Sequence, residues 1–161
     1  MTRLMTFLVF EQFGFLDIVG PGDVFTIANQ QAGKPLYKIQ ITTPGKHEYI
    51  NSESGMRVGI DTDFLTIRGP HTLLINGGDG FRKALENTLL IEQLSRLAKR
   101  TKRVSSICTG AFLLAEAGLL KKTACDYSLG LCRRITTTIS RSRCSIRRTV
   151  HQKWKIHNGC R

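Results

Sequence analysis

Hydrophobic and polar positions divide the first 120 residues into alternating strand-like and helix-like segments. Runs rich in β-branched and aromatic residues predict strands at residues 4–10, 37–43, 56–60, 72–75 and 104–107. Apolar residues that recur at helical spacing predict helices at residues 17–29, 87–99 and 109–120. Strands that alternate with helices form parallel sheets covered on both faces, so this order predicts an α/β fold.

The periodicity stops after Leu120, and the composition changes at the same point. Residues 121–161 carry 11 of the 24 lysines and arginines but one of the 12 aspartates and glutamates. They also hold Cys125, Cys132, Cys144 and Cys160, whose spacing fits neither a zinc site nor a disulfide framework. We therefore predict an α/β domain at residues 1–120 and a basic tail at residues 121–161, with no metal and no cofactor.

Neither a membrane-spanning segment nor an export signal is predicted. No apolar run is long enough to cross a bilayer. The apolar start of the chain lacks the small-residue cleavage pattern of a signal peptide. We expect a cytoplasmic protein that makes no membrane contact.

One cysteine, Cys108, stands where the last predicted strand meets the last predicted helix. The small residues Ser106 and Gly110 lie two positions to either side of it, as in the sharp strand-to-helix turn known as a nucleophile elbow. At a helix N-terminus, unpaired N–H groups and the helix dipole favour the thiolate form of a cysteine. The pattern indicates nucleophilic or redox chemistry, and a buried structural cysteine is the alternative.

Three segments of the chain resemble one known group, the class I glutamine amidotransferase-like ThiJ/PfpI superfamily. They read FLDIVGP at residues 15–21, LLINGG at residues 73–78 and ICTGAFLLAEAGLL at residues 107–120. Within this superfamily the chain is most similar to the N-terminal domains of AraC-type transcription regulators, with isonitrile hydratases a step further away. The resemblance implies a flavodoxin-like parallel sheet sandwiched by helices, with a cysteine nucleophile elbow, truncated after the elbow helix.

The resemblance also implies a site built from three parts of the chain. Cys108 and Asp17 are the catalytic candidates, because a protonated carboxyl can donate a hydrogen bond to a thiolate. Gly77, Gly78 and Thr109 are the ligand-binding candidates, and the N–H groups of Gly78 and Thr109 are expected to form an oxyanion hole. The alternatives are an N-cap role for Asp17, a plain turn at the glycines and a first-turn position for Thr109.

A histidine that the resemblance implies is missing. The elbow helix in this family is typically followed by a segment reading RRATTHW, and this chain has KKTACDYSLGLC at residues 121–132. Catalysis by a cysteine usually needs a base. No motif positions His47, His71, His151 or His157 for that role. If the chain is an enzyme, we expect a cysteine-dependent hydratase or hydrolase.

We interpret the chain as the ligand-sensing domain of an AraC-type regulator that lacks its helix-turn-helix DNA-binding part. The expected partners are a small-molecule ligand and a second copy in a homodimer, with DNA contacted only through the absent domain. The alternatives are a stand-alone enzyme such as an isonitrile hydratase, and a protein whose exposed thiol senses oxidants. A basic run, Arg96, Lys99, Arg100, Lys102 and Arg103, is interpreted as a solvated helix end rather than a phosphate site.

A change of reading frame explains the tail and the missing histidine together. DNA that encodes Thr123 to Cys132 can, when shifted by one nucleotide, read RRATTHWAYA. We predict that the chain is translated out of frame from Lys121 onward, and resequencing the gene across this segment is expected to locate the shift. A sound frame, with homologues that share the tail, would contradict this prediction and favour a genuine basic arm that contacts nucleic acid.

Overall fold

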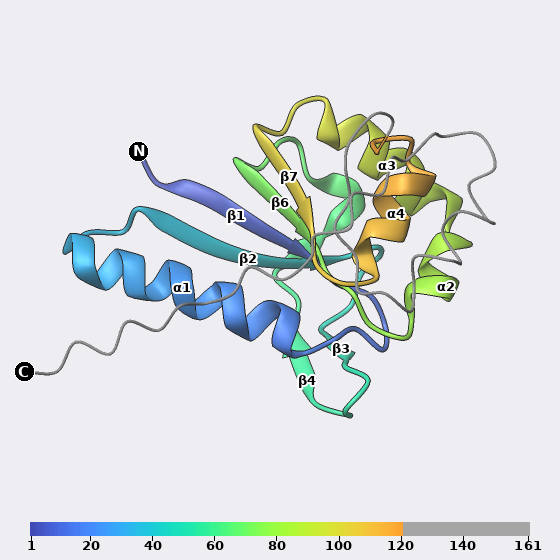
Figure 1. Cartoon of the computed structure of the whole chain (residues 1–161), viewed down its shortest axis with the longest axis horizontal. Coiled ribbons are helices and arrows are strands. Elements are labelled where there is room, and N and C mark those ends of the chain that lie inside the picture. Colours follow the sequence, from blue (N-terminus) through green and yellow to red (C-terminus); the bar gives the residue numbers. More distant parts are fainter. Residues whose placement is uncertain (121–161) are drawn as a thin grey trace, which may run out of the picture. The chain divides into compact units, whose positions relative to one another are not determined.

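A parallel sheet of five strands is the centre of this computed structural model, which describes residues 1–120 (Figure 1). The strands lie in the order β5-β2-β1-β6-β7, and every neighbouring pair is parallel. Their bounds are β1 (Arg3–Leu8), β2 (Tyr37–Thr43), β5 (Thr62–Asp63), β6 (Thr72–Ile75) and β7 (Arg103–Ser106). A separate antiparallel hairpin pairs β3 (Tyr49–Asn51) with β4 (Arg57–Gly59). The predicted α/β fold is confirmed.

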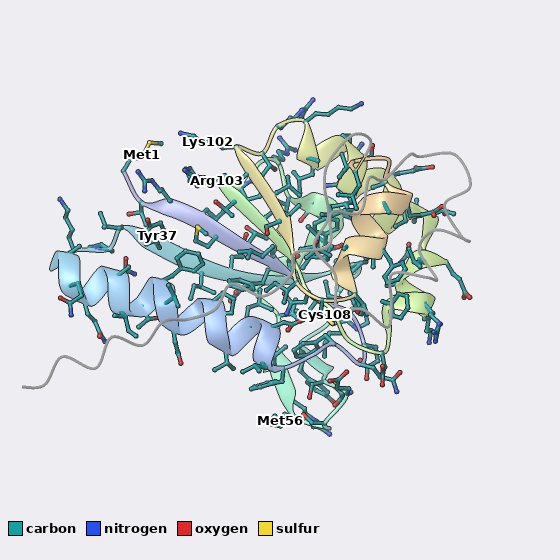
Figure 2. All side chains as sticks on the ribbon, in the orientation of Figure 1. Met1, Tyr37, Met56, Lys102, Arg103 and Cys108 are labelled. Atoms are coloured by element: carbon teal, nitrogen blue, oxygen red, sulfur yellow. The ribbon has the colours of Figure 1, made fainter. Side chains whose placement is uncertain are left out.

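The helices lie on both faces of the sheet (Figure 1). They are α1 (Leu16–Ala32), the short 3-10 helix η1 (Phe64–Thr66), α2 (Phe81–Leu85), α3 (Thr88–Ala98) and α4 (Gly110–Glu116). On one face α1 packs against β2, where the ring of Phe25 lies 5.1 Å from that of Tyr37, which is labelled in Figure 2. On the other face α3 packs against η1, α2 and α4. No helix among residues 1–120 is long and apolar enough to cross a membrane.

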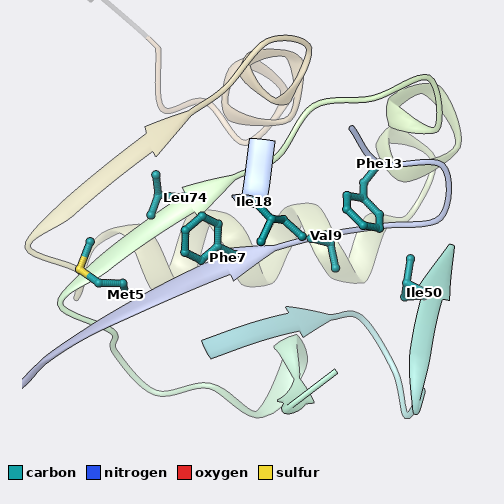
Figure 3. Close-up of a cluster of buried hydrophobic side chains, with 7 residues drawn as sticks. All are labelled: Met5, Phe7, Val9, Phe13, Ile18, Ile50 and Leu74. Atoms are coloured by element: carbon teal, nitrogen blue, oxygen red, sulfur yellow. The ribbon is translucent and has the colours of Figure 1, made fainter. Parts of the chain in front are cut away.

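The central strands β1 and β6 are buried on both faces over residues 5–8 and 72–75, which explains why these segments are mostly apolar. Met5, Phe7 and Leu74 belong to a buried cluster beneath α1, which Ile18 of that helix completes (Figure 3). Leu73 and Ile75 alternate with Leu74 along β6 and are also fully buried. At about 1.5–3 kcal/mol for each large apolar side chain removed from water, burial on both faces favours the central position of these strands in the sheet.

The last predicted helix is shorter than the sequence pattern indicated. The apolar run extends to Leu120, whereas α4 ends at Glu116. Gly118 has a φ of 73°, in the left-handed region that ends helices and that glycine adopts without strain. The sequence pattern also missed β3, β5, η1 and α2, because segments of two to five residues are too short to show a period. The predicted tail and its reading frame lie outside the described residues.

Gly110, the first residue of α4, lies directly against the end of β6. A Cβ at this position would come 2.6 Å from the carbonyl oxygen of Asn76 and would also collide with the carbonyl oxygen of Ile75. Real Cβ atoms are not found this close to backbone, so a side chain here would push α4 away from the sheet.

We therefore expect Gly110→Ala to lower the free energy of unfolding of the full chain by about 1–3 kcal/mol. Gly22→Ala is the matched control, because a Cβ at Gly22 in α1 meets only the end of the Ile39 side chain, at an ordinary contact distance of 3.7 Å. That substitution is expected to stabilise the chain by about 0.5–1 kcal/mol, since alanine is the better helix former. Urea denaturation of both variants measures the difference, and equal effects would contradict the close packing of α4 on β6.

Candidate functional site

Cys108 occupies a strained turn between β7 and α4, at the carboxyl end of the sheet (Figure 2). Its φ is 49°, in the left-handed region that residues other than glycine seldom adopt. The side chain is exposed and the thiol is free. Backbone strain of this kind persists only where the surrounding structure holds it in place, and such positions cluster at functional sites.

Gly77 connects Cys108 with Asp17. The N–H of Gly77 donates a 2.9 Å hydrogen bond to Oδ2 of Asp17. On its other side, a Cβ built on Gly77 would lie 2.8 Å from Cβ of Cys108 and 2.9 Å from the backbone nitrogen of Thr109. Only a residue without a side chain fits between the Cys108 turn and Asp17. The structure therefore brings together three of the residues that the sequence selected.

Gly78 and Thr109 are also brought together, through a hydroxyl group. The N–H of Gly78 donates to Oγ1 of Thr109 at 2.9 Å, and the same hydroxyl lies 3.1 Å from the carbonyl oxygen of Gly78, to which it donates. Gly78 has a φ of 128°, which strains any other residue. Because its N–H is engaged, a ligand oxygen would have to displace the Thr109 hydroxyl to use Gly78 as half of an oxyanion hole.

Asp17 does not cap its helix. The N-cap of α1 is Phe15, without a side-chain hydrogen bond, and Asp17 lies in the first turn with its carboxylate directed to Gly77. Partial burial raises the pKa of Asp17 above its ordinary value of 3.8, and the hydrogen bond from the Gly77 N–H opposes this rise. The carboxyl therefore holds its proton to a higher pH than an exposed aspartate does, and a protonated carboxyl is a hydrogen-bond donor.

Loops that the sequence did not select complete this edge of the sheet. The N–H of Gly14 donates to the carbonyl oxygen of Gly77 at 2.8 Å, which fixes the start of α1 against the loop after β6. The segment between β3 and β4 reaches the same edge, because the N–H of Asp79 lies 3.3 Å from Oε2 of Glu53 and donates to it. Gly14 adjoins the first motif, but no local signal marks Glu53, whose position depends on the hairpin.

Asn76 is a further polar residue at this edge that the sequence did not select. It ends the buried run of β6 and is itself fully buried. Neither its side-chain oxygen nor its nitrogen has a hydrogen-bond partner among residues 1–120. A buried amide without hydrogen-bond partners is unfavourable by about 1–3 kcal/mol. Asn76 is therefore a position where the described part of the fold leaves a buried polar group without hydrogen bonds.

The histidines of the described residues are not brought to Cys108. His71 precedes β6 at the amino end of the sheet, and its ring nitrogen Nδ1 lies 3.0 Å from the hydroxyl of Thr72. His47 lies in the loop after β2 and lines a hollow of about 290 Å³ together with Asp63. His151 and His157 lie outside the described residues. Within residues 1–120, no three His, Cys, Asp or Glu side chains are grouped so that they could hold a metal ion.

Comparison with proteins of known sequence finds an uncharacterized protein and transcription regulators that are similar to this chain. The chain is 37% identical over 114 residues to a Streptomyces lividans protein described as uncharacterized, in the cpoL 5' region, covering 71% of this chain and 79% of that protein. It is 44% identical over 69 residues to the HTH-type transcriptional regulator Rv1931c of Mycobacterium tuberculosis, covering 43% of this chain and 27% of the regulator. The HTH-type transcriptional regulator GlxA of Rhizobium meliloti is 31% identical over 71% of this chain. The chain spans 35% of the length of GlxA.

Solved structures show the same fold. A ThiJ/PfpI family protein from Pseudomonas syringae superposes with a TM-score of 0.65 at 26% identity, covering 75% of this chain and 48% of that protein. An AraC family transcriptional regulator from Pseudomonas putida gives a TM-score of 0.71 at 18% identity, covering 84% of this chain and 71% of that protein. The family model described as DJ-1/PfpI family matches residues 4–135. On this match, and on the fold and relatives that agree with it, the chain belongs to the DJ-1/PfpI family.

Proposed function

We propose that residues 1–120 are the ligand-sensing domain of an AraC-type transcription regulator, with a small molecule bound beside Cys108. The observation that carries the proposal is the contact of Gly77 with both Asp17 and the Cys108 turn. It joins an exposed thiol, a carboxyl whose pKa is raised by burial and a glycine-lined backbone at one edge of the sheet. Ligands of open parallel sheets bind at the carboxyl ends of the strands, which is where this edge lies.

The polar groups at this edge suit a small polar ligand. Oδ2 of Asp17 accepts the hydrogen bond from the Gly77 N–H, which leaves Oδ1 to contact a ligand. The thiol of Cys108 adds a weak donor or, when ionised, a nucleophile. Homology to HTH-type transcriptional regulators supports sensing as the use of this site, with DNA contacted through a helix-turn-helix part that these 120 residues do not form.

We further propose that the domain acts in the cytoplasm as a homodimer. The outer side of α1 supports the dimer, because Leu16, Val24 and Ile27 are 76%, 63% and 53% exposed. Apolar side chains gathered on one exposed helix are typical of surfaces that bind another protein, and most soluble oligomers are homo-oligomers, of which dimers are the commonest.

A cysteine-dependent enzyme such as an isonitrile hydratase is the second candidate function. The specific observation in its favour is the φ of 49° at Cys108, which resembles the strain of a nucleophile elbow. Against it, neither His47 nor His71 is placed to act as a base for Cys108, although cysteine nucleophiles usually need one.

An activity assay and the sequence of the downstream DNA distinguish the two candidate functions. We expect the full chain to convert cyclohexyl isocyanide and water to N-cyclohexylformamide no faster than the Cys108→Ala variant does. We also expect the DNA that follows the codon of Leu120 to contain a frame that encodes two helix-turn-helix units. Turnover that is lost in Cys108→Ala, together with a stop soon after one domain in every frame, would overturn the sensing proposal in favour of the enzyme.

A further inference from the structure

A basic groove lies on the α3 side of the sheet, away from Cys108. It has a volume of about 460 Å³ and runs between α3 and the segment that follows β5. Its lining includes three basic residues and three apolar ones, Arg68, Arg96, Arg100, Leu65, Ile67 and Leu97. Among residues 1–120, no aspartate or glutamate lines it. A concave site of this size falls within the range of about 300–1,000 Å³ that small-molecule pockets occupy.

The three arginines come from two separate parts of the chain. Arg96 and Arg100 are four residues apart at the end of α3, which places them on one side of the helix. Arg68 belongs to the loop before β6, so that arginines from both parts of the chain line the groove. Of the basic run at residues 96–103 that the sequence showed, Arg96 and Arg100 line the groove, whereas Lys99 and Lys102 do not. Two of its arginines line a cavity rather than forming only a solvated helix end.

A buried glutamine holds one of these arginines in position. Gln93 is 4% exposed, and its Nε2 donates to the carbonyl oxygens of Phe64 and Ile67, at 3.3 and 3.1 Å. Its Oε1 accepts a 2.9 Å hydrogen bond from Nε of Arg96 and a second one from Nη2. A guanidinium has five N–H donors, so three remain on Arg96 after these two bonds. A side chain fixed in this way loses less conformational freedom when it binds an anion.

We propose that this groove binds a small organic phosphate. Three guanidinium groups without a carboxylate in the lining match a group with two negative charges, and the fork of an arginine matches phosphate oxygens in pairs. Leu65, Ile67 and Leu97 provide an apolar wall for the organic part of the ligand. The apolar wall favours a small organic phosphate over a duplex backbone, whose contacts to a protein are mainly polar and charged.

The groove is a site separate from the Cys108 edge. Arg68 precedes β6 and Arg100 precedes β7, so both lie toward the amino ends of these strands. Cys108 follows the carboxyl end of β7, and Figure 2 shows it at the opposite end of that strand from Lys102 and Arg103. An adjoining hollow of about 420 Å³ shares Leu65, Gln93 and Arg96 with the groove and adds one acidic residue, Glu92. Phosphate binding is therefore independent of the proposed sensing function.

Isothermal titration of the full chain with phenyl phosphate and with inorganic phosphate tests the proposal. We expect phenyl phosphate to bind at one site per chain and more tightly than inorganic phosphate, because only the ester reaches the apolar wall. Arg68→Gln, Arg96→Gln and Arg100→Gln are each expected to weaken binding at least about tenfold, as the loss of a charged hydrogen bond does. All three side chains are exposed, so the variants are expected to keep the far-ultraviolet circular dichroism of the wild type.

Lys99→Gln is the matched control, because it removes the same charge from the same helix end outside the groove. We expect it to change the affinity less than about twofold, since Lys99 is exposed outside the lining and its charge is screened by salt. Equal weakening by Lys99→Gln and the arginine variants would overturn the proposal. So would the absence of phenyl phosphate binding, or a duplex DNA that binds more tightly and loses affinity equally with all four substitutions.

Discussion

The candidate site depends on a position where no side chain fits. Gly77 lies between the Cys108 turn and Asp17. Its N–H donates a hydrogen bond to the Asp17 carboxyl group, and the absence of a Cβ leaves room for the side chain of Cys108. Gly110 makes a similar approach to the end of β6 and brings α4 against the sheet immediately after Cys108. The strained φ of Cys108 is held by these two contacts, since a residue larger than glycine at either position would separate β6 from the turn.

The sequence predicted the long elements well, because their burial imposes a pattern. The strand at residues 37–43 agrees with β2 at both ends, and the helix at residues 87–99 differs from α3 by one residue at each end. The end of the last predicted helix was wrong, since an apolar run shows burial but not where Gly118 turns the backbone. Val24 and Ile27 helped to predict α1 although both are exposed, which shows that periodicity can identify a helix without identifying its buried face.

The candidate site was predictable where a residue belongs to a motif and unpredictable where its position depends on tertiary structure. Cys108, Asp17 and the two glycines stood in three recognisable segments, and the fold places these segments at one edge of the sheet. Glu53 reaches this edge only because β3 and β4 form a hairpin, which their three-residue length did not reveal. The basic groove was missed for the same reason, because Arg68 is far in sequence from Arg96 and Arg100.

The most direct test of the account follows the amide of Gly77 by NMR in ¹⁵N-labelled full chain. If Gly77 joins Asp17 to the Cys108 turn, its amide shift will titrate with the Asp17 carboxyl at a midpoint above 3.8, because burial raises the pKa of that group. The same amide will shift when Cys108 is alkylated and will lose its titration in Asp17→Asn. A Gly77 amide that responds to neither Asp17 nor Cys108 would contradict the account.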